Sequence, residues 1–338
     1  MSNPNRVPDF ASESRLAEIR RQASQAAPLA GGVVPMDAPF PPHKESYYGI
    51  HLLKEPQWTN EVPLYFFIGG AAGASAMVAS AAELMSGDQE LVRSARWVAA
   101  LGGMVSAGLL TSDLGVPSRF LNMLRVFKLQ SPMSVGAWTL TAFSSLSAAA
   151  AFANFMRTKL GDATPVKIIE NASGMLAAST GLVMASYTGV LVGATVIPTW
   201  NRHVGSLPMH FAASGLNSAV SILELMGHDS RALDLLGFAA SAYELTQGVQ
   251  IEVNRDRINR PLQHGKSGFL VRAGGVLSGP APLLLRLAYA VTGNKKLRQA
   301  AAACSIAGSL LTRFGWVEAG KASARDYAVP LLLDKTAS

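Results

Sequence analysis

The 338-residue sequence contains little charge, few histidines and one cysteine. Charged residues make up 15% of the chain, whereas soluble domains carry about 25%. Cys304 alone cannot form an intrachain disulfide, and it cannot hold an iron–sulfur cluster, which needs about four ligands. Because its neighbours are small and apolar, we interpret it as a small buried residue. The composition therefore excludes an ordinary soluble domain and a cluster-bearing electron carrier.

The net charge of +7 does not indicate nucleic-acid binding. The Lys and Arg residues lie in short clusters between long apolar runs, which is typical of membrane proteins. The 31 glycines and many alanines fit helices that pack closely in lipid. The predicted loops on the side of the termini carry more Lys and Arg than the opposite loops. This distribution favours cytoplasmic termini.

Eight segments are predicted to be membrane-spanning helices, because a helix needs about 20 apolar residues to cross a bilayer. The last four carry ionisable groups, which cost about 2.5–3.5 kcal/mol each at mid-membrane and must face protein or water. We predict an all-α integral membrane protein, with residues 1–55 as a polar N-terminal tail, 56–324 as the transmembrane domain and 325–338 as a C-terminal tail. The predicted spans, in an apolar and a more polar half, are Val62–Met85, Ala95–Leu114, one within Ser131–Met156, one within Asn171–Asn201, Ser206–Met226, Arg231–Ile251, Ser267–Val291 and Leu297–Val317.

The connection between the second and third spans contains charged residues close to membrane depth. Asp113 is predicted at the end of one span, and Arg119 follows before the next span begins. A carboxylate and a guanidinium in this position can pair, which keeps the acid ionised or ready to accept a proton. A quinol that is oxidised to a quinone releases two protons and needs such an acceptor. Alternatively, Asp113 caps a helix end or pairs with Arg119 for purely structural reasons.

Four stretches of the sequence resemble the NrfD family, which includes the membrane subunit of polysulfide reductase. The connection Thr111–Trp138 reads TSDLGVPSRFLNMLRVFKLQSPMSVGAW and is similar to the family's signature between its second and third helices. The other stretches are PLYFFIGGAAG (Pro63–Gly73), YTGVLVGATVIPTWN (Tyr187–Asn201) and RFGWVEAGKASA (Arg313–Ala324). The resemblance covers about residues 56–324 and implies eight helices in two four-helix bundles.

The resemblance also implies a function. Family members bind a quinone, either menaquinone or ubiquinone, in the first bundle, near the side where an iron–sulfur subunit docks. We therefore expect a quinone-binding subunit of an oxidoreductase complex in the bacterial inner membrane. Its partners would be a ferredoxin-like iron–sulfur subunit and a larger catalytic subunit that handles the terminal substrate. Of the six histidines, only His210 lies well inside a predicted span. No histidine pair for a haem can form at depth, so electrons must pass to another chain.

The residues expected to contact the quinone follow from the matched motifs. Asp113 and Arg119 would form the polar corner of the site. Polar side chains at the start of the first helix would lie beside it, with Asn60 or Glu61 replacing a histidine that some members use. Tyr187 is a further candidate, although a buried tyrosine can equally bond to a backbone carbonyl. The complete predicted set is Trp58, Asn60, Glu61, Tyr65, Asp113, Arg119 and Tyr187.

Three carboxylates in or near the spans, Glu83, Glu224 and Glu244, are predicted members of a proton relay. The alternative is that the acids pair with Arg272, Arg286 or Arg313 and hold the helices in register. The stretch Gly315–Ala324 is predicted to be a surface on which a partner binds.

Two rival functions fit the same composition. Charged groups inside the membrane and glycine-interrupted helices also suit a transporter or ion pump. A purely structural membrane anchor for a redox enzyme is the other alternative.

Overall fold

The computed structural model describes residues 53–85, 88–114, 116, 118, 120–161 and 164–326. Almost all of these residues are helical, and no strand occurs among them. The predicted all-α class is therefore confirmed for this part of the chain. The tails predicted at 1–55 and 325–338 lie mostly outside the described residues.

The described residues of the first half of the chain form four long helices and one short helix. Asp88 begins α3 by accepting hydrogen bonds from the backbone N–H groups of Glu90 and Leu91. Ser131 caps α5 in the same way, and Pro132 occupies the first turn, where its missing N–H costs nothing. These helices are α2 (Glu61–Met85), α3 (Gln89–Asp113), the short α4 (Phe120–Met123), α5 (Pro132–Leu160) and α6 (Thr164–Gly193).

In the second half, the residues up to 326 form five longer helices and three short ones. Ser230 and Asn294 cap α9 and α13 with their side chains. Gly279 and Pro280 separate α11 from α12, since proline begins a new helix and cannot continue the old one. The elements are α7 (Pro198–Arg202), α8 (Leu207–Leu225), α9 (Arg231–Val253), η3 (Arg257–Asn259), α10 (Arg260–Gln263), α11 (Gly265–Ser278), α12 (Pro280–Thr292) and α13 (Lys295–Arg325).

Each of the eight predicted spans coincides with a helical segment, with two corrections. The fourth span was predicted to lie within Asn171–Asn201, but α6 begins earlier, at Thr164, and ends at Gly193, and α7 begins at Pro198. The seventh consists of α11 and α12 with the break at Gly279. Within the described residues, five segments are long and apolar enough to cross a membrane: α2, most of α5, α6, α11 with α12, and α13. The helices α3, α8 and α9 are less apolar.

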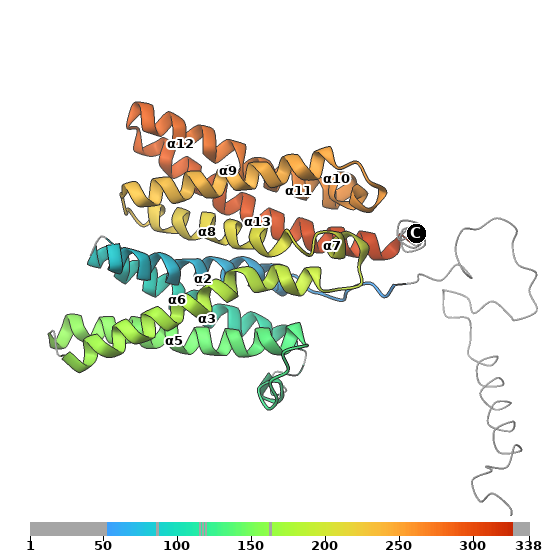
Figure 1. The fold of residues 1–338 in the computed structure, drawn as a ribbon. Coiled ribbons are helices and arrows are strands. Elements are labelled where there is room, and N and C mark those ends of the chain that lie inside the picture. Colours follow the sequence, from blue (N-terminus) through green and yellow to red (C-terminus); the bar gives the residue numbers. More distant parts are fainter. Residues whose placement is uncertain are drawn as a thin grey trace, which may run out of the picture. The chain divides into compact units, whose positions relative to one another are not determined.

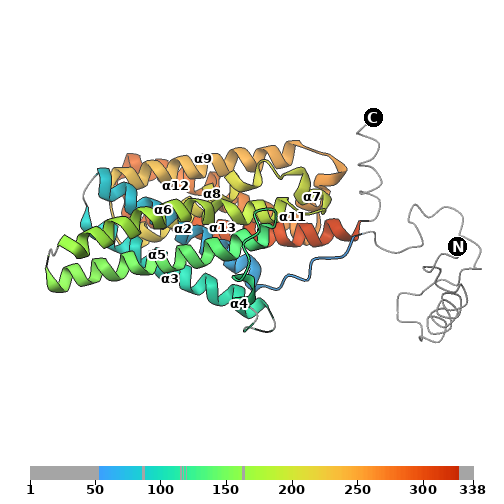
Figure 2. The same cartoon turned by 60° about the horizontal axis from the view of Figure 1, so that its bottom comes forward.

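The long helices form two groups that meet where α2 and α6 pack against α8 (Figures 1 and 2). The N-terminal helix group comprises α2, α3, α5 and α6, and the C-terminal helix group comprises α8, α9, α11, α12 and α13. Glycine allows α2 to approach both neighbours: a Cβ atom at Gly73 would lie 2.4 Å from the Gly181 oxygen of α6, and one at Gly215 of α8 would lie 2.8 Å from the Gly70 oxygen. Small residues at such crossings are typical of helices that pack in lipid.

Antiparallel packing gives the helices two distinct ends. We call the end with Glu61, Asp113 and Pro132 the Asp113 end, and the end with Met85, Gln89 and Thr164 the opposite end. Contacts between distant segments define both ends. Thr59 bonds to Asp113 at the first, and Arg157 bonds to Gln89 at the second, with 2.6 Å between nitrogen and oxygen. The short helix α4 continues from the Asp113 end (Figure 2).

Candidate functional site

The start of α2 and the last residue of α3 meet at the Asp113 end. The hydroxyl of Thr59 donates a hydrogen bond to Oδ1 of Asp113, across 54 positions of sequence. Asp113 is half-buried, and Asn60 beside Thr59 is exposed. The contact arises because α2 and α3 are adjacent antiparallel helices joined by a short connection. A carboxylate is thereby held at the edge of an apolar helix group. Arg119, predicted to share this corner, lies outside the described residues.

Aromatic rings form a wall beside this corner. Trp58 stacks on Trp200 of α7, with ring centroids 4.9 Å apart, and meets Phe66 edge-on at 5.8 Å. Trp200 is fully buried and donates its indole N–H to the Trp316 carbonyl over 2.8 Å. The wall fixes the segment that enters α2, since aromatic pairs in these geometries add stability beyond their buried area.

Two buried tyrosines lie deeper in the N-terminal helix group. Tyr65 of α2 and Tyr187 of α6 are only 2% and 5% exposed, and they are close enough to interact electrostatically. The Tyr187 phenol lies directly over Gly136 of α5, where an added Cβ atom would come within 2.1 Å of the ring carbon and the oxygen. Glycine is therefore required at position 136 for this placement of the phenol.

The Ser106 hydroxyl is buried close to Tyr65 and has no hydrogen-bond partner among the described residues. Its oxygen and the Tyr65 ring both lie close to Gly69, at 3.4 and 3.6 Å from the position of a Cβ atom there. Ser106 precedes Asp113 by two helical turns and shares its face of α3. The structure thus brings Tyr65, Tyr187 and Ser106 together, with Thr59 and Asp113 at the end of the same helix group. Sequence reasoning missed Thr59, Ser106 and Gly136, although the spacing of Ser106 was a usable signal.

The serines of the SPMS motif shape the connection that follows Asp113. Ser131 caps α5. The Ser134 hydroxyl accepts a hydrogen bond from the Lys128 N–H over 3.1 Å and donates one to the Val126 carbonyl over 3.2 Å. These bonds fold the end of the connection against the first turn of α5. The motif therefore has a structural role next to the candidate site.

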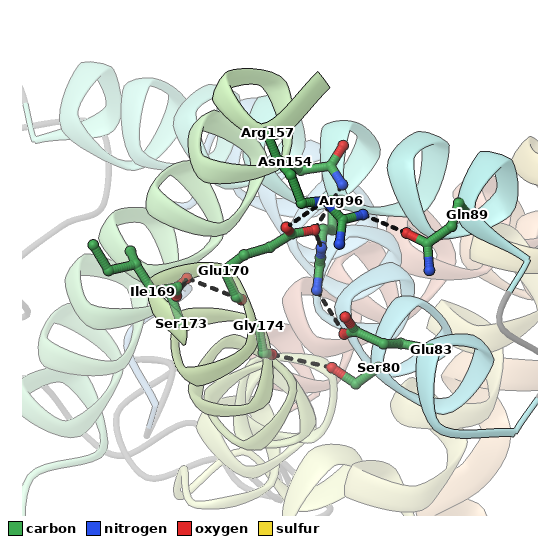
Figure 3. A network of polar contacts seen from close by, with 10 residues as sticks. All are labelled: Ser80, Glu83, Gln89, Arg96, Asn154, Arg157, Ile169, Glu170, Ser173 and Gly174. Atoms are coloured by element: carbon green, nitrogen blue, oxygen red, sulfur yellow. Dashed lines mark hydrogen bonds and ion pairs between the residues drawn. The ribbon is translucent and has the colours of Figure 1, made fainter. Parts of the chain in front are cut away.

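Glu83 lies at the opposite end in a buried charge network with Arg96 (Figure 3). Arg96 binds Glu83 at 2.6 Å and also pairs with the fully buried Glu170. Arg157 approaches the other Glu170 oxygen at 3.1 Å, and Asn154 donates to Glu170 over 2.7 Å. Two arginines thus balance two carboxylates. Arg96 was not among the arginines predicted to pair with these acids.

The other two predicted relay acids have different surroundings. Glu224 accepts from both terminal nitrogens of Arg286, one of the arginines predicted as a structural partner, at 2.5 and 2.9 Å. Glu244 is 1% exposed and accepts a hydrogen bond from Ser278 over 3.0 Å. Glu224 is therefore ion-paired with an arginine, whereas the hydrogen bond of Glu244 comes from a neutral hydroxyl.

The stretch Gly315–Ala324 was predicted to be a partner-binding surface, and this was wrong. It continues α13, and most of its residues are buried. A Cβ atom at Gly320 would lie 2.0 Å from the Trp200 ring. The stretch packs against α7 because small residues admit that indole.

The sequence was compared with family models and with curated proteins. The family model described as "Polysulphide reductase, NrfD" matches residues 56–228, which is more than half of the chain. The chain belongs to the NrfD family. The matched region contains all four helices of the N-terminal group, α7 and α8. No match was found among curated proteins. Together with its five apolar helical segments, the match identifies an NrfD-family membrane protein.

Proposed function

We propose that this NrfD-family chain is the quinone-binding membrane subunit of a multi-subunit oxidoreductase. The observation that carries the proposal is the juxtaposition of Thr59 and Asp113 at the end of a helix group that buries Tyr65 and Tyr187. A quinone ring requires an apolar, partly aromatic site with polar groups for its oxygens. The hydroxyl of Ser106, which has no hydrogen-bond partner in the described part of the chain, and the Tyr187 phenol packed over Gly136 fit these needs. The menaquinone or ubiquinone supplies two-electron, two-proton redox chemistry when bound.

The protein's residues would handle binding and proton movement. Asp113, with Arg119, is the proposed proton acceptor at the polar corner, and Thr59 orients the carboxylate through its hydrogen bond. Asn60 and Glu61 at the start of α2 are proposed to contact an oxygen of the ligand. Trp58 and its aromatic neighbours exclude water from the side facing α7.

The electrons are proposed to leave for an iron–sulfur partner that docks at the Asp113 end, with a larger catalytic subunit beyond it. The connection after Asp113 exposes large apolar side chains there. Leu121, Phe127 and Leu129 are 68%, 52% and 74% exposed, and Arg125 and Lys128 beside them are exposed too. An apolar patch with basic neighbours suits a partner with an acidic rim.

We further propose that all eight long helical segments cross the membrane, as two four-helix bundles formed by the N-terminal and C-terminal helix groups. The less apolar helices α3, α8 and α9 turn their polar residues inward, which makes crossing feasible: Arg96, His210 and Glu244 are all nearly fully buried. Residues 56–324 would then form the transmembrane domain, in the bacterial inner membrane.

Electron transfer from a quinol in the purified complex tests the function. Asp113→Asn removes the proton acceptor, so we expect a rate loss of about 100-fold or more. Arg119→Ala should also slow the reaction. Asp256→Asn is the matched control, because Asp256 is 58% exposed and lies outside the site. Unchanged turnover in both site variants would favour a purely structural anchor, and unaided transport by the isolated chain would favour a transporter.

A further inference from the structure

A cavity of about 20 Å³ lies inside the C-terminal helix group, away from the proposed quinone site. It is enclosed by α8, α9, α11 and α13, and its polar lining comes from His210, Glu244, Thr312 and Trp316. A single water molecule requires about 10–15 Å³ and two to four polar partners. The cavity is large enough for one water molecule, and His210 and Glu244 at its wall can serve as polar partners.

Several polar atoms around this cavity have no partner among the described residues. They are both ring nitrogens of His210, Oε1 of Glu244 and the indole nitrogen of Trp316. His210 is 4% exposed and Glu244 is 1% exposed, so bulk solvent does not satisfy them. Nδ1 of His210 lies 3.9 Å from Oε2 of Glu244, which is too far for a direct hydrogen bond. A water molecule held in the cavity would bridge Nδ1 of His210 and the Glu244 carboxylate across this distance.

Arg313 gives the cluster its charge balance. Its side chain is 1% exposed, its guanidinium lies 3.7 Å above the Phe211 ring, and one nitrogen donates to the Phe211 carbonyl over 2.8 Å. No carboxylate of the described residues lies within ion-pair distance of it. Glu244 is the acid that interacts with it electrostatically. Arg313 and an ionised Glu244 sum to zero charge, so the cluster can accept one proton and carry a single positive charge.

Glu244 differs in its partners from Glu83 and Glu224, the other two carboxylates predicted as proton-relay members. Glu83 and Glu224 are each bound by an arginine at 2.6 Å or less. Glu244 faces a neutral hydroxyl, an imidazole and a cavity. The charged or titratable groups that face His210 are Glu244 from α9, Arg313 from α13 and His203 from the turn before α8. The cavity lining from α11 contains no charged residue.

We propose that His210 and Glu244, bridged by water in this cavity, form a proton-exchange site in the C-terminal helix group. One proton enters from bulk water and is shared between the imidazole and the carboxylate; no electrons move and no covalent bond other than that to the proton changes. The site is independent of the quinone site and of the electron transfer proposed there.

His203 provides the connection to the Asp113 end. It lies two helical turns before His210, and its ring bonds to Asn259 over 2.9 Å. Both histidine rings contact the Trp316 ring, at centroid distances of 5.3 and 6.1 Å. Burial lowers the pKa of His203, which favours the neutral imidazole. We place the entry of protons to the site at the Asp113 end, because His203 lies there and both histidine rings contact Trp316.

Infrared difference spectroscopy of the purified full-length chain, titrated between about pH 5 and 9 without quinone, tests the proposal. The wild type should show a coupled change in imidazole and carboxyl bands. Glu244→Gln should abolish the carboxyl component, and His210→Gln the imidazole component. Glu252→Gln is the matched control, because Glu252 lies on the same helix but is exposed and paired with Arg272. Its spectrum should match the wild type.

Ser278→Ala keeps both titrating groups and removes the hydrogen bond to Glu244, so it serves if either of the other variants fails to fold. We expect its bands to persist with a shifted titration midpoint. A wild-type spectrum without any titrating band, or titrating bands unchanged in Glu244→Gln, His210→Gln and Ser278→Ala, would overturn the proposal. Because no quinone is present, these results are separate from those of the Asp113→Asn experiment.

Discussion

At the Asp113 end, a few polar side chains lie inside an otherwise apolar helix group. Asp113 is oriented by one hydroxyl, and Tyr65, Tyr187 and Ser106 provide polar atoms one to two turns deeper. Each is short or aromatic and fits between helices without disturbing their packing. The proposed site therefore depends on positions where even one extra carbon would displace a neighbour.

Gly136→Ala tests this dependence on space. The added methyl group would collide with the Tyr187 phenol, so the phenol must move. We expect the apparent KM for quinol to rise about tenfold or more, since small misplacements near reacting groups have large effects. Steady-state kinetics of the purified complex measure it. Gly108→Ala is the control, because Gly108 faces open space and its variant should behave as wild type. Equal KM values in both variants would contradict the placement of Tyr187.

At the scale of elements, buried ion pairs join the helices at the end opposite to Asp113. The Arg96 network connects α2, α3, α5 and α6 (Figure 3). In the C-terminal helix group, Glu224 connects α8 to α12 and α13 through Arg286 and Arg298. Both networks lie near the ends of the long helices opposite to Asp113. Each network fixes the register of the helices in its group.

Arg96→Met should destabilise the protein by about 3–5 kcal/mol, because it leaves Glu170 buried without its closest cation. Thermal unfolding of the purified protein in detergent measures the effect. Arg93→Met is the control: Arg93 lies on the same helix and is exposed, so its loss should change stability by no more than about 0.5 kcal/mol. A melting temperature of Arg96→Met equal to that of the control would show that the network contributes nothing.

Much of the element structure was predictable from the sequence, because uninterrupted apolar runs mark helices. The break at Gly279 inside the seventh span was not predicted, because the residues on both sides of it are apolar. The end of α6 at Gly193 could not be predicted, because the residues after it remain apolar while leaving the helix. The pairing of Arg96 with Glu170 was not predictable, since it depends on how two helices 74 residues apart are rotated about their axes. For the same reason the polar corner was partly predicted through Asp113, while Thr59 and Ser106 were missed.

At the scale of the whole molecule, eight crossings predict on which side each connection lies. Lys128 and Lys266 would share one side, and Lys159 and Lys296 the other; all four are exposed. The single native cysteine makes this testable: in a Cys304→Ala background, each lysine is replaced by cysteine and labelled with an impermeant thiol reagent in oriented vesicles. We expect Lys128→Cys and Lys266→Cys to react from the same side and the other two from the opposite side. Any other pairing would contradict eight crossings.

Photoaffinity labelling tests most directly whether a quinone binds between the start of α2 and the end of α3. The purified complex is irradiated with an azidoquinone, digested, and mapped by mass spectrometry, with excess natural quinol as competitor. We predict competable labels in peptides that contain Trp58–Tyr65 or Asp113, and their loss in Asp113→Asn. Labelling confined to the C-terminal helix group, or labelling that quinol does not displace, would contradict the proposed site.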